Sequence, residues 1–95
     1  MSDDKLHPGM GERLWKLKLV LDETVEFPTE YIFKFIVPLS EIHHVLFHLK
    51  DFNIEQKSSA NGNYISVTAK KVFANSDEII RVYKSVGTIK GLIAL

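Results

Sequence analysis

Residues 27–95 have the sequence FPTEYIFKFIVPLSEIHHVLFHLKDFNIEQKSSANGNYISVTAKKVFANSDEIIRVYKSVGTIKGLIAL, and this stretch decides the fold. Runs rich in aromatic and β-branched residues, which favour strands, alternate in it with runs whose apolar residues recur every three and four positions, which favour helices. The predicted order is strand, helix, hairpin, helix and strand. Because crossover connections are right-handed, this order predicts a four-stranded antiparallel sheet with both helices on one face.

The first predicted strand is Tyr31 to Val37. Apart from Lys34 it is apolar on both faces, which is expected of a central strand that is covered on two sides. Pro38 ends it, and Ser40 is the expected N-cap of the following helix. The apolar face of that helix is formed by Ile42, Val45, Leu46 and Leu49.

A hairpin follows this helix. Residues from Phe52 to Lys57 alternate as an edge strand does, and the return strand runs from Tyr64 to Phe73. The connecting loop, Ser58 to Asn63, contains an Asn-Gly pair, which is the strongest short-range signal for a hairpin.

The second helix is predicted to begin after Asn75, because Asn75 and Glu78 have the spacing of a capping box. Its apolar face comprises Ile79, Val82, Tyr83 and Val86. Gly87 fits the position after the helix, where a positive φ is favoured, and residues 88–95 are the expected last strand. The complete prediction is an α+β, ferredoxin-like βαββαβ two-layer sandwich.

The segment before this domain has two interpretations. Residues 1–11 are polar and are expected to be a flexible leader. Residues 13–23 fit a helical period and also alternate as a strand would; because Leu, Lys and Arg favour helix, residues 12–25 are predicted to be an extra helical segment. The domain proper is therefore expected at residues 26–95.

Composition excludes several classes of function. The twelve basic and twelve acidic residues cancel, whereas domains that hold nucleic acid through phosphates usually carry a basic excess. There is no cysteine, so disulfides and thiolate chemistry are excluded. No apolar run is long enough to span a bilayer and no secretory signal precedes the domain, which predicts a cytoplasmic protein without a membrane segment.

The motifs of residues 26–95 resemble the YbeD-like family, a group of small bacterial proteins with a domain of unknown function. The resemblance rests on Glu26-Phe27-Pro28-Thr29, on Ser58-Ser59 with Gly62-Asn63-Tyr64 and Ser66-Val67, and on Ile80, Tyr83 and residues 87–95. It implies an ACT-like, ferredoxin-like fold. It implies no activity and supplies no catalytic or ligand residues.

The hairpin loop is the candidate ligand site. Its hydroxyl, amide and backbone N–H groups could hold a carboxylate or phosphate, although turn chemistry alone accounts for most of these residues. The candidate ligand-binding residues are Ser58, Ser59, Asn61, Gly62, Asn63 and Tyr64.

Two exposed aromatic residues are candidate partner contacts. Phe47 lies on the helix face opposite the apolar stripe, and Trp15 belongs to the N-terminal segment. Single exposed aromatics also occur without any function, so this interpretation stays open against that alternative.

Two further patterns are weaker. His44 and His48 lie four residues apart and could share a metal ion with Asp51 nearby, but a solvated helix surface explains them as well. The strand aromatics could stack RNA bases, but the expected glycine-aromatic signature is missing and core packing is the better interpretation. We expect no metal, no cofactor and no catalytic residues.

The leading hypothesis is therefore a non-catalytic regulatory or adaptor module that acts through protein contacts, with a homodimer as one possibility. The alternative is an ACT-like sensor of an amino acid or another small anionic metabolite. An RNA-binding module is a more distant third hypothesis.

Overall fold

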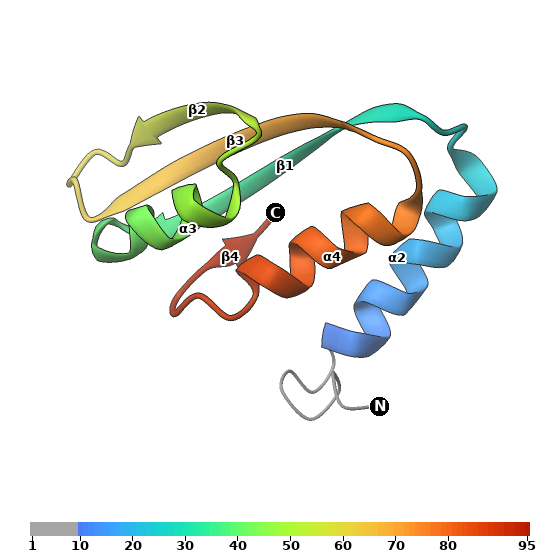
Figure 1. Cartoon of the computed structure of the whole chain (residues 1–95). Coiled ribbons are helices and arrows are strands. Elements are labelled where there is room, and N and C mark those ends of the chain that lie inside the picture. Colours follow the sequence, from blue (N-terminus) through green and yellow to red (C-terminus); the bar gives the residue numbers. More distant parts are fainter. Residues whose placement is uncertain (1–9) are drawn as a thin grey trace.

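The computed structural model describes residues 10–95, and Figure 1 shows their arrangement as one sheet with helices packed beneath it. The elements in chain order are α2 (Met10–Thr24), β1 (Thr29–Pro38), the short 3-10 turn η1 (Leu39–Glu41), α3 (Ile42–His48), β2 (Asn53–Ser58), β3 (Tyr64–Phe73), α4 (Ser76–Val86) and β4 (Ile93–Ala94). The chain is thus an α+β protein with a four-stranded sheet.

The sheet is antiparallel throughout, with the strand order β2-β3-β1-β4. The long central pair is β1 with β3, which stay in register from Thr29 opposite Phe73 to Pro38 opposite Tyr64. All three helices lie on one side of the sheet (Figure 1). This architecture is consistent with a ferredoxin-like sandwich.

The core lies between the sheet and the helices. Alternate residues of β1 and β3 point into it, because successive side chains of a strand point to opposite faces. The buried strand side chains are Phe33, Phe35, Val37, Ile65, Val67, Ala69 and Phe73. They are covered by Val45 of α3, by Leu49 directly after it, and by Ile79 and Val86 of α4, as the apolar spacing predicts.

Helix α2 packs beside α4 (Figure 1). Its apolar stripe buries Leu14 and Leu21, which lie seven residues apart on one helical face. The predicted flexible leader, residues 1–11, lies outside the described residues except for Met10 and Gly11, which are the first residues of α2.

The helix caps differ from one another in how well the sequence predicts them. Asn75 caps α4 as expected, since its side chain accepts a hydrogen bond from the N–H of Glu78. The Glu78 carboxylate accepts a hydrogen bond from the N–H of Ala74. The expectation that Ser40 caps α3 is wrong, because Ser40 lies inside η1 and α3 begins after Glu41 without a side-chain cap.

The end of the chain also departs from the prediction. Gly87 has a φ of −63°, so it does not end α4 in the left-handed region; Gly91 does take a positive φ, of 76°. The segment after α4 continues in turns that bury Ile89, and the predicted strand at residues 88–95 is reduced to Ile93–Ala94. A turn that buries the Ile89 side chain therefore takes the place of most of the last strand.

The outer face of the sheet is open. The apolar residues on both faces of β1 predict that this central strand is covered on two sides, and this prediction is wrong for the outer face. Ile32 points outward and is 50% exposed, because α2 packs beside α4 on the helical side.

Candidate interaction surface

The hairpin loop between β2 and β3 is closed by its own polar groups. The Ser59 hydroxyl donates to the Asn61 side-chain oxygen at 2.9 Å and accepts from the N–H of Tyr64 at 3.1 Å. The same Asn61 oxygen accepts from the N–H of Asn63 at 3.1 Å, and Gly62 supplies a φ of 75°. These groups are paired with one another, so the loop has the chemistry of a tight turn and Ser59 has a structural role.

The other candidate ligand residues lie around this closed loop. The side chains of Ser58, Asn63 and Tyr64 are exposed. Ser58 is the last residue of β2 and Tyr64 is the first of β3, so these two residues flank the loop on its two sides. The structure brings the predicted set together, but its central hydroxyl and amide oxygens already hold the turn.

Trp15 and Phe47, the candidate partner contacts, are both exposed, at 58% and 68%. They are not neighbours, because Trp15 belongs to α2 and Phe47 to α3, and α4 separates these helices in the helical layer (Figure 1). The Phe47 ring has the Lys50 ammonium 5.4 Å from its centroid. Two separate exposed rings do not form one contact surface.

The histidines of α3 have different partners. Nδ1 of His44 lies 2.8 Å from a carboxylate oxygen of Glu41, whereas Nδ1 of His48 lies 3.0 Å from the Ser85 hydroxyl on α4. Within residues 10–95, no group of three or more His, Cys, Asp and Glu side chains could hold a metal ion.

Most strand aromatics belong to the core. Phe33, Phe35 and Phe73 are buried on the helical side, so their rings do not lie on the open face. The hydroxyls of Tyr31 and Tyr83 are 3.0 Å apart. Burial raises the pKa of the Tyr83 phenol, and the hydrogen bond with Tyr31 raises it further.

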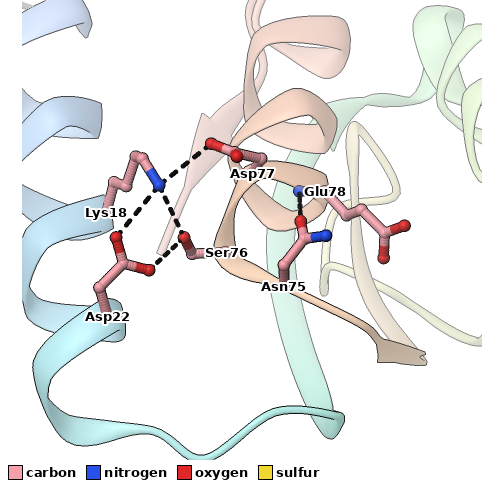
Figure 2. A network of polar contacts seen from close by, with 6 residues as sticks. All are labelled: Lys18, Asp22, Asn75, Ser76, Asp77 and Glu78. Carbon is pink, nitrogen blue, oxygen red and sulfur yellow. Dashed lines mark hydrogen bonds and ion pairs between the residues drawn. The ribbon is translucent and has the colours of Figure 1, made fainter.

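A polar network fixes α2 against the start of α4, as Figure 2 shows. The Lys18 ammonium lies 3.1 Å from oxygens of Asp22, Ser76 and Asp77. The Ser76 hydroxyl donates to the Asp22 carboxylate. Hydrogen bonds to Ser76 and then to Lys18 lower the pKa of Asp22, and those to Asp22 and Asp77 raise the pKa of Lys18. This network links α2 to the start of α4, on the helical side of the sheet.

The exposure of the outer face of the sheet is therefore the largest difference between the structure and the prediction of a central strand covered on two sides. This face carries Glu30, Ile32, Lys34 and Ile36 on β1, with Ser66, Thr68, Lys70 and Val72 on β3 and Ile93 on β4. Val72 is 61% exposed and Ile93 is 53% exposed. Since Ile93 lies opposite Ile36, apolar side chains gather where β4 meets β1, with Lys34 two residues from Ile36 on the same face of β1.

The sequence left three possibilities for this second face of the sheet: exposure to solvent, cover by the N-terminal segment, or contact with a partner. The structure excludes cover by α2, because α2 packs against α4 and Ile32 stays 50% exposed. The isoleucines at 32 and 36 alternate with the phenylalanines at 33 and 35, so one set must face away from the helices. The apolar residues on both faces also fit a strand that is covered on both sides. Only the position of α2 shows that the isoleucine side stays open.

A groove lies between α2, α4 and β4. Its volume is about 460 Å³, and its lining is largely apolar, including Leu14, Leu17, Val86 and Leu92. Arg13 is the charged side chain among its lining residues. An apolar groove with one cation at its wall suits a small molecule that carries an acidic group.

Strand β2 forms the edge of the sheet, as its alternating sequence predicts. It pairs with β3 on one side, from Asn53 opposite Lys70 to Ser58 opposite Ile65. It is one of the two terminal strands in the sheet order, with β4 at the other end. Its other side therefore presents backbone N–H and C=O groups that no strand of residues 10–95 satisfies.

No helix within residues 10–95 is both long enough and apolar enough to cross a membrane. Comparisons of the chain with protein-family models, with curated proteins and with solved structures found no match. The function is therefore argued from the geometry of the chain itself.

Proposed function

We propose that this protein is a non-catalytic regulatory or adaptor module that acts in the cytoplasm through protein contacts, and that the open outer face of its sheet is the contact surface. The ferredoxin-like assignment and the YbeD-like resemblance are parts of the same proposal. Because that family has no established activity, the resemblance adds no mechanism.

The observation that supports the proposal is a group of isoleucines on the open face, two on the central strand β1 and one on its neighbour β4. Ile32, Ile36 and Ile93 stand on one face of rigid, paired strands, and Ile32 and Ile93 are each about half exposed. An apolar patch rimmed by polar residues is typical of a protein interaction site. Lys34 and Lys70 lie among these residues, which favours a partner surface that is apolar with acidic groups at its margin.

The test compares two substitutions at hydrophobic positions of similar exposure, Ile32 at 50% and Trp15 at 58%. Ile32→Glu places a carboxylate in the centre of the open face, whereas Trp15→Glu places one on the exposed side of α2. The wild-type chain is first used to isolate a partner, and binding is then measured with both proteins purified. We expect Ile32→Glu to weaken binding by about tenfold or more and Trp15→Glu to leave it unchanged.

Equal binding by wild type and Ile32→Glu would exclude the open face. Circular dichroism of both variants checks that they are folded. Because both variants carry the same change in charge, a general electrostatic effect would affect them alike.

The groove beside Arg13 favours a second candidate, an ACT-like sensor of an amino acid or another small carboxylate. A titration of the chain with pooled carboxylates, followed by backbone amide NMR, tests it. Saturable shifts at α2, α4 and β4 that disappear in Arg13→Ala would support the groove. Shifts confined to residues 58–64 that disappear in the Ser59→Ala, Asn61→Ala double variant would instead restore the hairpin site.

A further inference from the structure

The backbone groups that β2 turns toward open solvent follow from its hydrogen bonding. The N–H of Ser59 donates to the carbonyl of Tyr64 at 2.9 Å, which places these two residues in a hydrogen-bonded pair. Such pairs alternate along an antiparallel ladder, so Lys57 and Glu55 also turn their N–H and C=O groups toward β3. Ile54, Gln56 and Ser58 therefore turn theirs outward.

This outward set matches a second copy of itself. If two β2 strands run antiparallel about a two-fold axis at Gln56, Gln56 faces the same residue of the partner strand and Ile54 faces the partner's Ser58. All of these residues present outward N–H and C=O groups, so each pair can exchange two hydrogen bonds. If the two strands were shifted by an odd number of residues, residues whose N–H and C=O groups point outward would face residues whose groups point toward β3, and the hydrogen-bond ladder could not form.

The charges select the same register. With the axis at Gln56, Glu55 lies opposite the partner's Lys57 and Lys57 lies opposite the partner's Glu55. These are non-hydrogen-bonded pairs, in which side chains come closest, about 4.5 Å between Cα atoms. An axis at Glu55 would oppose two glutamates and an axis at Lys57 two lysines, and like charges directly opposite destabilise a sheet.

Both charged side chains lie on the outer face of the sheet, since Glu55 pairs with Thr68 and Lys57 with Ser66. Both are exposed, and neither takes part in an ion pair among residues 10–95. Charges on an edge strand normally prevent pairing with other chains. In β2 the two charges have opposite signs and flank Gln56. Pairing about Gln56 therefore brings unlike charges together, whereas an axis at Glu55 or at Lys57 brings like charges together.

We propose that two copies of this chain join edge to edge through β2, antiparallel about Gln56, and form one continuous sheet. The inference rests on the proposed function, because a two-fold axis through the edge places both open faces on the same side and doubles the contact surface. The occupant of the edge is a second copy of the chain rather than a strand of another protein, since the charge pattern of β2 is complementary to itself.

Introduced cysteines test the register directly, because the natural chain has none. A cysteine at 56 meets itself on the axis, with Cα atoms about 5.5 Å apart, within the range of a disulfide. We expect Gln56→Cys to form a disulfide-linked dimer under mild oxidation. Asn53→Cys is the matched control on the same strand, since its two copies would be about 20 Å apart at 3.3 Å per residue.

Mixing separates this register from others. Glu55→Cys and Lys57→Cys are expected to cross-link with each other and much less with themselves, because position 55 of one copy faces position 57 of the next. If Gln56→Cys cross-links no faster than Asn53→Cys, the proposal is overturned. Equal cross-linking of every combination would show random collisions and would overturn it as well.

Charge reversal provides a second measurement without cysteines. We expect sedimentation over a concentration series to show a dimer, which Glu55→Lys weakens by about tenfold and Glu55→Lys with Lys57→Glu restores. A monomer at every concentration, or a dimer indifferent to both variants, would contradict the proposal. Partner binding that depends on Ile32 is measured separately. The proposal of dimerisation through β2 and the proposal of partner binding through the open face can therefore be contradicted independently.

Discussion

The hydroxyl of Ser76, the first residue of α4, donates a hydrogen bond to the carboxylate of Asp22 on α2 (Figure 2). Ser76 is only 2% exposed, whereas Asp22 is exposed. Lys18 completes the arrangement, because its ammonium contacts both partners. This contact joins two helices whose sequences lie more than fifty residues apart, and it adds a polar link to the apolar packing of α2 through Leu14 and Leu21.

The Asp22 contact should make stability depend on pH in the acid range. Its pKa is lowered below its ordinary value near 3.8, so its contribution is complete above that value and is lost as the pH falls through the lower folded pKa. We expect Asp22→Asn to be less stable than wild type at neutral pH, and the difference to close at strongly acid pH. Urea unfolding of both proteins across this range measures it.

The control for this prediction is Glu23→Gln, which removes the neighbouring carboxylate on α2 but touches none of the network residues. A wild-type advantage over Asp22→Asn that persists unchanged at strongly acid pH would show that the carboxylate charge has no part in docking α2.

The cap of α4 gives a second prediction. Asn75 accepts a hydrogen bond from the N–H of Glu78 at 3.1 Å and satisfies one of the free donors at the helix start. We expect Asn75→Ala to lower the free energy of unfolding by about 1 kcal/mol. Asn75→Ser should retain most of this stability, because a serine hydroxyl can also accept the hydrogen bond of the cap. Equal losses in both variants would argue against a capping role.

The paired hydroxyls of Tyr31 and Tyr83 give a third prediction, in the alkaline range. Burial raises the pKa of Tyr83 above its ordinary value near 10. The native state therefore keeps the Tyr83 proton where the unfolded chain loses it, and this contribution to stability is complete below pH 10 and is lost as the pH rises above it. Titration followed by phenolate absorbance should show a late transition that Tyr83→Phe removes.

The same substitution should lower stability by about 1 kcal/mol at neutral pH, because it leaves the Tyr31 hydroxyl without its partner at 3.0 Å. Tyr64→Phe removes an exposed hydroxyl and is the matched control. A late transition that survives Tyr83→Phe would assign it to another group.

The turn before β4 gives the fourth prediction. Gly91 has a φ of 76°, and a Cβ there would lie 2.8 Å from the ring of Pro38. Gly62 has nearly the same φ, of 75°, with no atom within 4 Å of a Cβ. Gly62→Ala therefore measures the backbone cost alone, about 1–2 kcal/mol, and we expect Gly91→Ala to cost more.

The local readout for Gly91→Ala is hydrogen exchange of the Leu95 amide, which donates to the carbonyl of Lys34 at 2.9 Å. We expect its exchange to accelerate when β4 loosens. Equal losses of stability in Gly91→Ala and Gly62→Ala would show that the Pro38 ring moves away from the new methyl group without a cost in free energy.

The sequence predicted local structure well where one pattern acts alone. Asn61-Gly62 placed the hairpin turn, and the start of α4 followed from the spacing of Asn75 and Glu78. It failed where two local signals compete. Ser40 is a suitable cap residue, but the chain after Pro38 first makes a 3-10 turn, and the turn after Gly87 buries Ile89 instead of extending a strand.

The candidate surfaces were harder to predict because they depend on which elements are neighbours. The hairpin residues were predicted as a group, but only the geometry shows that Ser59 and Asn61 pair with each other. Trp15 and Phe47 were correctly expected to be exposed, yet they lie on separate helices.

Most strands and helices could be predicted from the sequence, because periodicity and turn chemistry act within a few residues; the last strand, reduced to Ile93–Ala94, is the exception. The self-complementary charge pattern of β2 is also a property of the sequence alone, since Glu55 and Lys57 flank Gln56. The position of α2 beside α4 could not be read from the sequence, because it depends on long-range contacts: the burial of Leu14 and Leu21 and the hydrogen bond from Ser76 to Asp22. With α2 held there, the isoleucines of β1 stay exposed, and the open face is a property of the packing rather than of any single segment.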